Sequence, residues 1–157
     1  MTTPIAYLSG AIEHAPDGGT GWRLTLGRFL REELKHDVYD PAEDAKKNLT
    51  DEELAGFRNW KLTAPDRFRG VVRKIIAWDL GLIERRANYL VALWDEPAAK
   101  GGGTAAEITL AHRLGKPVYL VLGMPRPAAS GWVLACAERV FESFEELQRF
   151  LRTLTED

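Results

Sequence analysis

Three segments that follow one another without a break decide the fold: Tyr89-Leu-Val-Ala-Leu-Trp94, Asp95-Glu-Pro-Ala-Ala-Lys-Gly-Gly-Gly-Thr-Ala-Ala-Glu107 and Ile108-Thr-Leu-Ala-His-Arg-Leu114. The first segment is a continuous apolar run, which is typical of a buried strand. The last segment has apolar residues at helical spacing. The loop between them is rich in glycine and carries an acid at its start and another at its end. In an open α/β sheet, ligands bind at such a strand-to-helix turn, so we expect a functional site here.

The remainder of the chain alternates between apolar runs and amphipathic segments. We expect strands at 5–8, 37–39, 89–94, 117–122 and 140–141, and helices at 22–35, 51–61, 67–86, 104–114, 133–137 and 143–154. Because the strands are continuously apolar rather than alternating, they predict a parallel sheet covered on both faces. The predicted fold is α/β, a flavodoxin-like or Rossmann-like doubly wound sheet of five parallel strands in the order 2-1-3-4-5. Its switch point lies between strands 5–8 and 89–94.

The length and composition fit one globular domain over residues 1–157. Apolar residues make up 45% of the chain and charged residues 28%. Segment 41–65 is polar but contains two aromatic residues, and we interpret it as a lid or an interface insertion. The net charge of −2 and the pI of about 6.0 give no basic surface for a nucleic-acid polymer.

Several classes of site and location are disfavoured by missing signals. The N-terminus lacks the features of a signal peptide and no apolar run is long enough to span a membrane, so we expect a cytoplasmic protein that binds no membrane. The three histidines show no metal-ligand spacing, so we predict no metal. Neither a Walker A loop nor a Gly-x-Gly-x-x-Gly turn after the first strand is present, so the sequence does not predict a dinucleotide cofactor.

Glu107 has two interpretations. Thr104-Ala-Ala-Glu107 fits a capping box, in which the glutamate only stabilises the start of its helix. Glu107 also shares a helical stripe with Leu110 and Leu114, which would direct it toward the sheet and a cleft. Both interpretations remain open on the pattern alone.

Asp79 and Tyr7 are the other candidate catalytic residues. Asp79 lies on the apolar stripe of its helix, where a carboxylate is costly unless it is paired or used. A structural partner such as Arg73 or Arg86 is the alternative to a functional role. Tyr7 ends the first strand, and the alternative there is a half-buried strand residue.

The candidate binding residues lie in the two turns that meet at the switch point: Ser9, Gly10, Asp95, Gly101, Gly103 and Thr104. The glycines could lie close to a ligand oxygen, and the helix start at Thr104 offers free N–H groups. The alternatives are ordinary turn residues. Two carboxylates that converge from separate helices on a cleft with a tyrosine suit glycosyl transfer, in which one acid attacks the anomeric carbon and the other manages the leaving-group proton.

Four segments in this order carry a resemblance to a known family: Tyr7-Leu-Ser-Gly-Ala-Ile12, Asp79, Ala87-Asn-Tyr-Leu-Val-Ala-Leu93 and Gly103-Thr-Ala-Ala-Glu-Ile-Thr-Leu-Ala-His-Arg-Leu-Gly-Lys-Pro-Val118. The chain resembles the nucleoside 2-deoxyribosyltransferase family, which includes 2'-deoxynucleoside 5'-phosphate N-hydrolases and pyrimidine-nucleotide hydrolases. The resemblance spans about residues 5–122, and its most specific part is the last segment.

The resemblance implies that Glu107 is a nucleophile that forms a covalent deoxyribosyl ester. It implies that Asp79 helps to protonate and bind the base, that Tyr7 orients Glu107, and that the Ser9-Gly10 turn contacts the sugar or a 5'-phosphate. It also implies nucleoside, nucleotide and nucleobase ligands, no cofactor, and a homo-oligomer, a dimer or larger.

The chain departs from the family pattern in three places. The acid that the transferases place six residues before the nucleophile is Gly101 here, and Asp95 could replace it. The chain end lacks the aromatic or carboxamide group of the transferases. Only Ser9 and, more remotely, Arg23 could stand for the Ser and Arg that the 5'-phosphate hydrolases carry after the first strand.

Three functions therefore stay open. A transferase that passes the deoxyribosyl group to another nucleobase is the first hypothesis. The alternative is an N-glycosidase that acts on a 2'-deoxynucleoside or nucleoside 5'-monophosphate and uses water. A non-catalytic nucleotide sensor with the same fold is the third.

Overall fold

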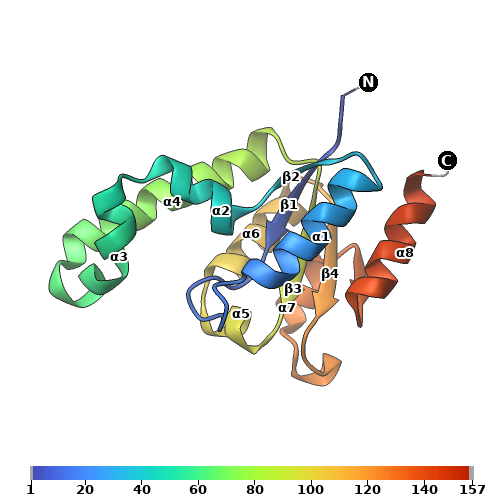
Figure 1. The fold of residues 1–157 in the computed structure, drawn as a ribbon. Helices are drawn as coiled ribbons and strands as arrows, with labels where there is room; N and C mark the ends of the chain where they lie inside the picture. The colour runs from blue at the N-terminus through green and yellow to red at the C-terminus, as the bar shows by residue number, and fades with distance from the viewer. Residues whose placement is uncertain (1, 156–157) are drawn as a thin grey trace.

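The fold is a single parallel sheet with helices on both faces (Figure 1). A computed structural model describes residues 2–155. The described strands are β1 (Ile5–Ser9), β2 (Asp37–Tyr39), β3 (Tyr89–Trp94), β4 (Val118–Leu122) and β5 (Arg139–Phe141). All neighbouring strands pair in parallel, in the order β2-β1-β3-β4-β5. The predicted fold class and strand order are confirmed.

The helices that connect the strands lie where the apolar periodicity predicts them. They are α1 (Thr20–Glu32), α3 (Asp51–Thr63), α4 (Pro65–Arg85), α6 (Gly103–Arg113), α7 (Gly131–Cys136) and α8 (Phe144–Thr155). Helix α3 begins at the predicted capping box, in which Thr50 and Glu53 bond to each other's backbone N–H groups. Helix α6 ends before Gly115, whose φ of 73° is the left-handed conformation that favours glycine.

Four short helices were not predicted: α2 (Pro41–Asp44), η1 (Ala45–Asn48), α5 (Glu96–Lys100) and η2 (Arg126–Ala128). Helix α5 lies inside the glycine-rich loop that the sequence indicated. The Asp95 side chain accepts a hydrogen bond from the Ala98 N–H, and a proline occupies the first turn. Both features are typical of helix starts, so the loop is shorter than predicted and begins at Gly101.

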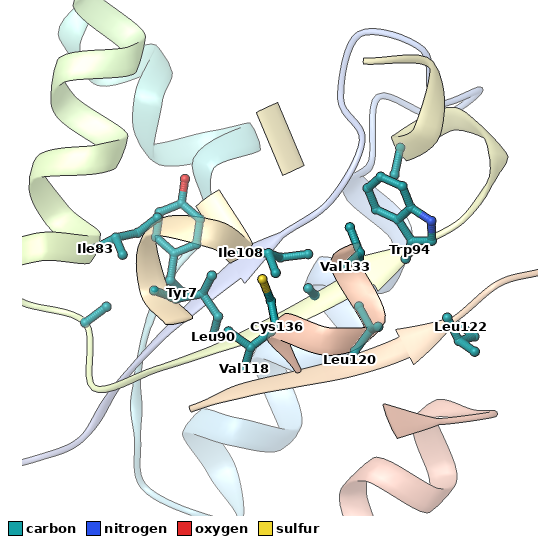
Figure 2. Close-up of a cluster of buried hydrophobic side chains, with 14 of the residues drawn as sticks. Tyr7, Ile83, Leu90, Trp94, Ile108, Val118, Leu120, Leu122, Val133 and Cys136 are labelled. Atoms are coloured by element: carbon teal, nitrogen blue, oxygen red, sulfur yellow. The ribbon is translucent and has the colours of Figure 1, made fainter. Parts of the chain in front are cut away.

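Two apolar clusters cover the two faces of the sheet. On one face, Tyr7 of β1 and Leu90 of β3 lie against Ile83 of α4 and Ile108 of α6 (Figure 2). On the other face, Leu8 of β1 lies in a cluster with side chains of α1 and α8. Successive residues of β1 therefore face opposite helical layers, which is why Tyr7 and Ser9 share the α4–α6 face.

Helix α3 and the first half of α4 form a helical hairpin that extends away from the sheet (Figure 1). We call residues 51–74 the helical hairpin. None of the α3 side chains is buried. Phe57 stacks on Phe68 with ring centroids 6.4 Å apart, and Arg67 lies 3.8 Å above the ring of Trp60. The segment predicted as a lid or interface insertion is thus ordered mainly by contacts with α4.

Candidate active site

Tyr7 and Ser9 place two hydroxyl groups at the carboxyl end of β1, on the face covered by α6. Both residues are fully buried. In Figure 2 the hydroxyl oxygen of Tyr7 lies at the end of the ring that points away from the apolar side chains of the cluster. The tyrosine ring therefore belongs to the core while its hydroxyl reaches the polar site above it.

Glu107 lies in the second turn of α6 and accepts a hydrogen bond from each of these hydroxyls. The Tyr7 hydroxyl donates to Oε2, and the Ser9 hydroxyl donates to Oε1 at 2.8 Å. The capping-box interpretation is wrong, because α6 begins at Gly103 with Gly102 at the cap position and no side-chain cap. Glu107 is therefore directed toward the sheet, and its partners lie about one hundred residues away in the chain.

Asp79 is 7% exposed and lies on α4, beside the same site. Its partner is neither Arg73 nor Arg86 but Tyr39 of β2, whose hydroxyl donates to Asp79 Oδ1 at 2.9 Å. The rings of Tyr39 and Tyr7 are stacked with centroids 5.3 Å apart. The two carboxylates thus accept hydrogen bonds from two adjacent tyrosines: Glu107 from Tyr7, and Asp79 from Tyr39.

The environment raises the pKa values of both carboxyl groups. Burial raises the pKa of Glu107 to about 7, and the negative charge of Asp79 adds to the rise. The hydrogen bonds from Tyr7 and Ser9 act in the opposite direction. Burial also raises the pKa of Asp79 to about 6, against the hydrogen bond from Tyr39. Glu107 lies beyond the first turn of α6 and is partly buried, so burial outweighs the effect of the helix start on its charge.

Tyr7 remains protonated in this environment. Burial raises its pKa well above the ordinary value, and the negative charges of Glu107 and Asp79 raise it further. A neutral tyrosine is a stable hydrogen-bond donor, so Tyr7 can orient the Glu107 carboxylate at any pH in the neutral range. This arrangement agrees with the predicted role of Tyr7, which no observation yet tests.

Arg23 occupies the core of the β1–α1 connection. It is 1% exposed, and its guanidinium donates to the carbonyl oxygens of Leu8, Gly10, Ala11 and Gly19. Its Nε also lies 3.6 Å from Asp40 Oδ1. These partners take up most of its donors, so Arg23 shapes the loop after β1 and is not a free phosphate ligand. The alternative that assigned it to a 5'-phosphate is therefore disfavoured.

Gly10 and Asp95 lie in the two turns at the switch point, as predicted. A side chain at Gly10 would lie 2.8 Å from the Trp22 ring, so the close approach requires glycine. Asp95 caps α5 and lines a hollow of about 210 Å³ between the loop after β1 and the end of β3. Trp22 lies in the wall of the same hollow. The lining of this hollow does not include Glu107.

The glycines at the start of α6 leave open space above the helix. A Cβ atom at Gly102 or Gly103 would meet no heavy atom within 4 Å, so the packing of the chain does not require glycine there. A Cβ at Gly101 would meet only His14, at 3.7 Å. Within residues 2–155, the backbone N–H groups of Gly103 and Thr104 have no hydrogen-bond partner. These donors can bind an anionic or sugar oxygen.

A larger hollow of about 410 Å³ lies between β5 and α8. Its lining includes Phe141 and Phe150, which belong to the cluster on the α1–α8 face. It therefore lies across the sheet from Tyr7 and Glu107. The larger hollow contains no buried acid, so the carboxylates and not the larger hollow mark the candidate active site.

Tyr39 was not predicted from the sequence, and Arg23 was named only as a remote candidate for a phosphate contact and not as a buried residue. Arg23 shares helical spacing with the buried Leu26 and Leu30, which is the same signal that singled out Asp79. Tyr39 carries no such signal, because its role depends on its register opposite Tyr7 in the neighbouring strand.

Between residues 2 and 155, no three His, Cys, Asp or Glu side chains gather as a metal site would need. No helix in that range combines the length and the apolar character needed to cross a bilayer.

Comparison with known proteins gives a match in structure and none in sequence. No protein-family model and no curated protein sequence matches the chain. Among solved structures, the CMP N-glycosidase BcmB of Clostridium botulinum superposes with a TM-score of 0.51 at 16% sequence identity. The superposition covers 96% of this chain and 98% of that chain. The two chains share one fold. This shared fold confirms the architecture that the family resemblance implied.

Proposed function

We propose that the protein is an N-glycosidase that cleaves the N-glycosidic bond of a nucleoside 5'-monophosphate, with Glu107 as nucleophile and water as acceptor. One observation carries the proposal: the Glu107 carboxylate accepts hydrogen bonds from the hydroxyls of Tyr7 and Ser9 and lies beside a second acid, Asp79, which is buried. The fold shared with a CMP N-glycosidase supports the reaction class.

In the first step, a Glu107 carboxylate oxygen attacks the anomeric carbon C1' of the sugar. The C1'–N bond breaks, its electron pair goes to the nucleobase, and protonated Asp79 gives its proton to that base. The products are a free base, a glycosyl ester of Glu107 and an Asp79 carboxylate. Tyr7 and Ser9 keep the nucleophile in one orientation during the attack.

In the second step, a water oxygen attacks C1' and the ester bond to Glu107 breaks. The Asp79 carboxylate takes the proton of the water, so both acids return to their starting states. This sequence follows the two-carboxylate logic of retaining glycosidases. The productive form has one proton on the pair, placed on Asp79. The pKa values of about 6 and 7 leave a single proton on the pair between about pH 6 and 7, and because Glu107 is the more basic acid, the productive form is the minor arrangement of that proton.

The start of α6 supports a substrate with a 5'-phosphate. The unpartnered N–H groups of Gly103 and Thr104 and the open space above Gly102 lie one helical turn before Glu107. A helix N-terminus favours negative charge, so a phosphate bound there would bring the sugar to the nucleophile. Neither Ser9, which bonds to Glu107, nor Arg23, which bonds to backbone carbonyls, is free for this purpose.

The test is release of free base from CMP and dCMP, measured by chromatography, with cytidine and deoxycytidine as substrates that lack the phosphate. The proposal predicts base release from at least one nucleotide, faster than from its nucleoside. A parallel reaction with deoxyinosine and free cytosine tests the transferase hypothesis, which requires a new deoxynucleoside. Binding of nucleotide without release of base would instead identify a sensor.

A further inference from the structure

Tyr39 occupies a position that connects the two halves of the site. It ends β2, an edge strand of the sheet, and stands in register with Tyr7 of β1. Its ring stacks on Tyr7 at an interplanar angle of 22°. It is 8% exposed, so the ring has little freedom to move. The ring of Tyr39 therefore buttresses the residue that orients Glu107.

The hydroxyl of Tyr39 is committed to Asp79. It donates to Oδ1 at 2.9 Å, and both residues are buried. Of the hydroxyl groups that act on Asp79, that of Tyr39 lowers its pKa more than that of Tyr7 does. A buried carboxylate with few donors depends strongly on its main donor for its orientation and for its charged state.

Five groups from five elements act on the charge of Asp79: Tyr39 of β2, Tyr7 of β1, Arg23 of α1, Asp44 of α2 and Glu107 of α6. Burial raises the Asp79 pKa most, and the charge of Asp44 adds to it. The Tyr39 hydrogen bond is the largest influence that lowers the pKa, followed by the charge of Arg23 and the contact with Tyr7. Removal of the Tyr39 hydroxyl should therefore raise the pKa of Asp79, because the main influence that opposes burial is lost.

We propose that Tyr39 is a positioning residue: its hydroxyl fixes the Asp79 carboxylate, and its ring fixes Tyr7 and thereby Glu107. Tyr39 touches neither the sugar nor the base in this role and acts through the two acids. For catalysis this inference rests on the proposed function, in which Asp79 gives its proton to the leaving base. The hydrogen bond itself can be tested without any activity.

The first test is a titration of the Asp79 carboxyl carbon by NMR in protein labelled with ¹³C-aspartate. In Tyr39→Phe, the ring and its stacking remain while the hydroxyl is lost. We expect the Asp79 midpoint to move upward by about one pH unit or more, since a hydrogen bond to a charged group is lost. An unchanged midpoint would overturn the proposal.

Tyr89→Phe is the matched control. Tyr89 is a buried tyrosine of β3 with its own hydrogen bond, to His36 Nδ1 at 2.6 Å, but it lies on the α1–α8 face. Its loss should leave the Asp79 titration unchanged. An equal shift in both variants would show a general effect of removing a buried hydroxyl and would contradict a specific role of Tyr39.

The second test is the pH dependence of kcat/KM for base release. In Tyr39→Phe, the alkaline limb should move to higher pH together with the NMR midpoint, and the maximal rate should fall about tenfold because Asp79 is less well oriented. Tyr39→Leu, which also removes the stacked ring, should lose more of kcat than Tyr39→Phe. If the alkaline limb of the pH profile stays in place while the NMR midpoint of Asp79 moves, Tyr39 has no role in the reaction. A wild-type protein that releases no base would refute the proposed function, and the titration would still decide the positioning role.

Discussion

Acidic side chains have opposite fates in the helical hairpin and in the site at the carboxyl end of β1. In the hairpin, Glu53 accepts a hydrogen bond from Lys74, which lowers its pKa. In the site, Glu107 and Asp79 receive neutral hydroxyl donors, and burial raises their pKa values. Hydrogen bonding alone does not decide the charge of an acid. The two regions differ in the partners and surroundings of their acids: the hairpin acid has a cationic partner in water, whereas the acids of the site have tyrosine partners in the core.

This difference separates stabilising acids from reactive ones. A paired surface acid stays ionised across the physiological range and contributes little to stability. An acid whose pKa is raised by burial to near neutral pH can gain and lose a proton at a small cost in free energy. General acids and nucleophiles need this property. Variants that remove single members of either region test how far the comparison extends.

The largest effect is expected from Glu107→Gln. Glutamine can still accept hydrogen bonds from Tyr7 and Ser9, so the fold should persist, but an amide oxygen is a poor nucleophile. Base release should fall at least about a thousandfold, measured as kcat under saturating nucleotide. A variant with more than a tenth of the wild-type rate would show that Glu107 is not the nucleophile.

A smaller loss is expected from Asp79→Asn. Asparagine can keep the Tyr39 hydrogen bond but has no acidic proton, so kcat/KM should fall about a hundredfold. The alkaline limb of the pH profile should disappear with it. Substrates with a better leaving base should be affected less, and an equal loss for good and poor leaving bases would argue against a proton-donor role.

The stability of the protein should depend on pH through Glu107. Its pKa is raised on folding, from 4.5 to about 7, so the folded state binds more protons than the unfolded state between these values. Stability attributable to this group therefore falls as pH rises from about 4.5 to 7 and is constant above that range. Compared with Glu107→Gln, the wild type should lose on the order of 1 to 3 kcal/mol of unfolding free energy over this interval.

Urea unfolding of both proteins at several pH values measures this difference. The variant should be the more stable protein at pH 8, and the gap should close toward pH 4.5. A gap that is the same at all pH values would mean that Glu107 is ionised throughout and that burial is not the dominant influence.

The smallest effect is expected in the hairpin. Thr50→Ala removes the side-chain cap of α3 and should cost about 1 kcal/mol or less of unfolding free energy. Base release should stay within about twofold, because no α3 side chain is buried. Thermal unfolding and the base-release assay measure the two quantities. A large loss of activity without a loss of stability would show that the hairpin contributes to the reaction.

The sequence predicts most of the fold because the strands are continuous apolar runs and the long helices carry clear apolar stripes. It also singles out Asp79, since a carboxylate on such a stripe needs an explanation, and Glu107, since it ends the glycine-rich loop. Helix α5 was missed because Asp95 was interpreted as a turn residue and not as a helix cap. The role of Tyr39 could not be predicted, because it depends on the register of β2 against β1 and on stacking across two strands.

Mass spectrometry of protein trapped with a 2'-fluoro nucleoside 5'-monophosphate tests the central claim most directly. The fluorine slows the hydrolysis of the ester, so the glycosyl enzyme accumulates. We predict a mass increase equal to one fluorinated sugar phosphate, located on Glu107 by peptide mapping and absent from Glu107→Gln. Release of base with no adduct, or an adduct on another residue, would contradict the account.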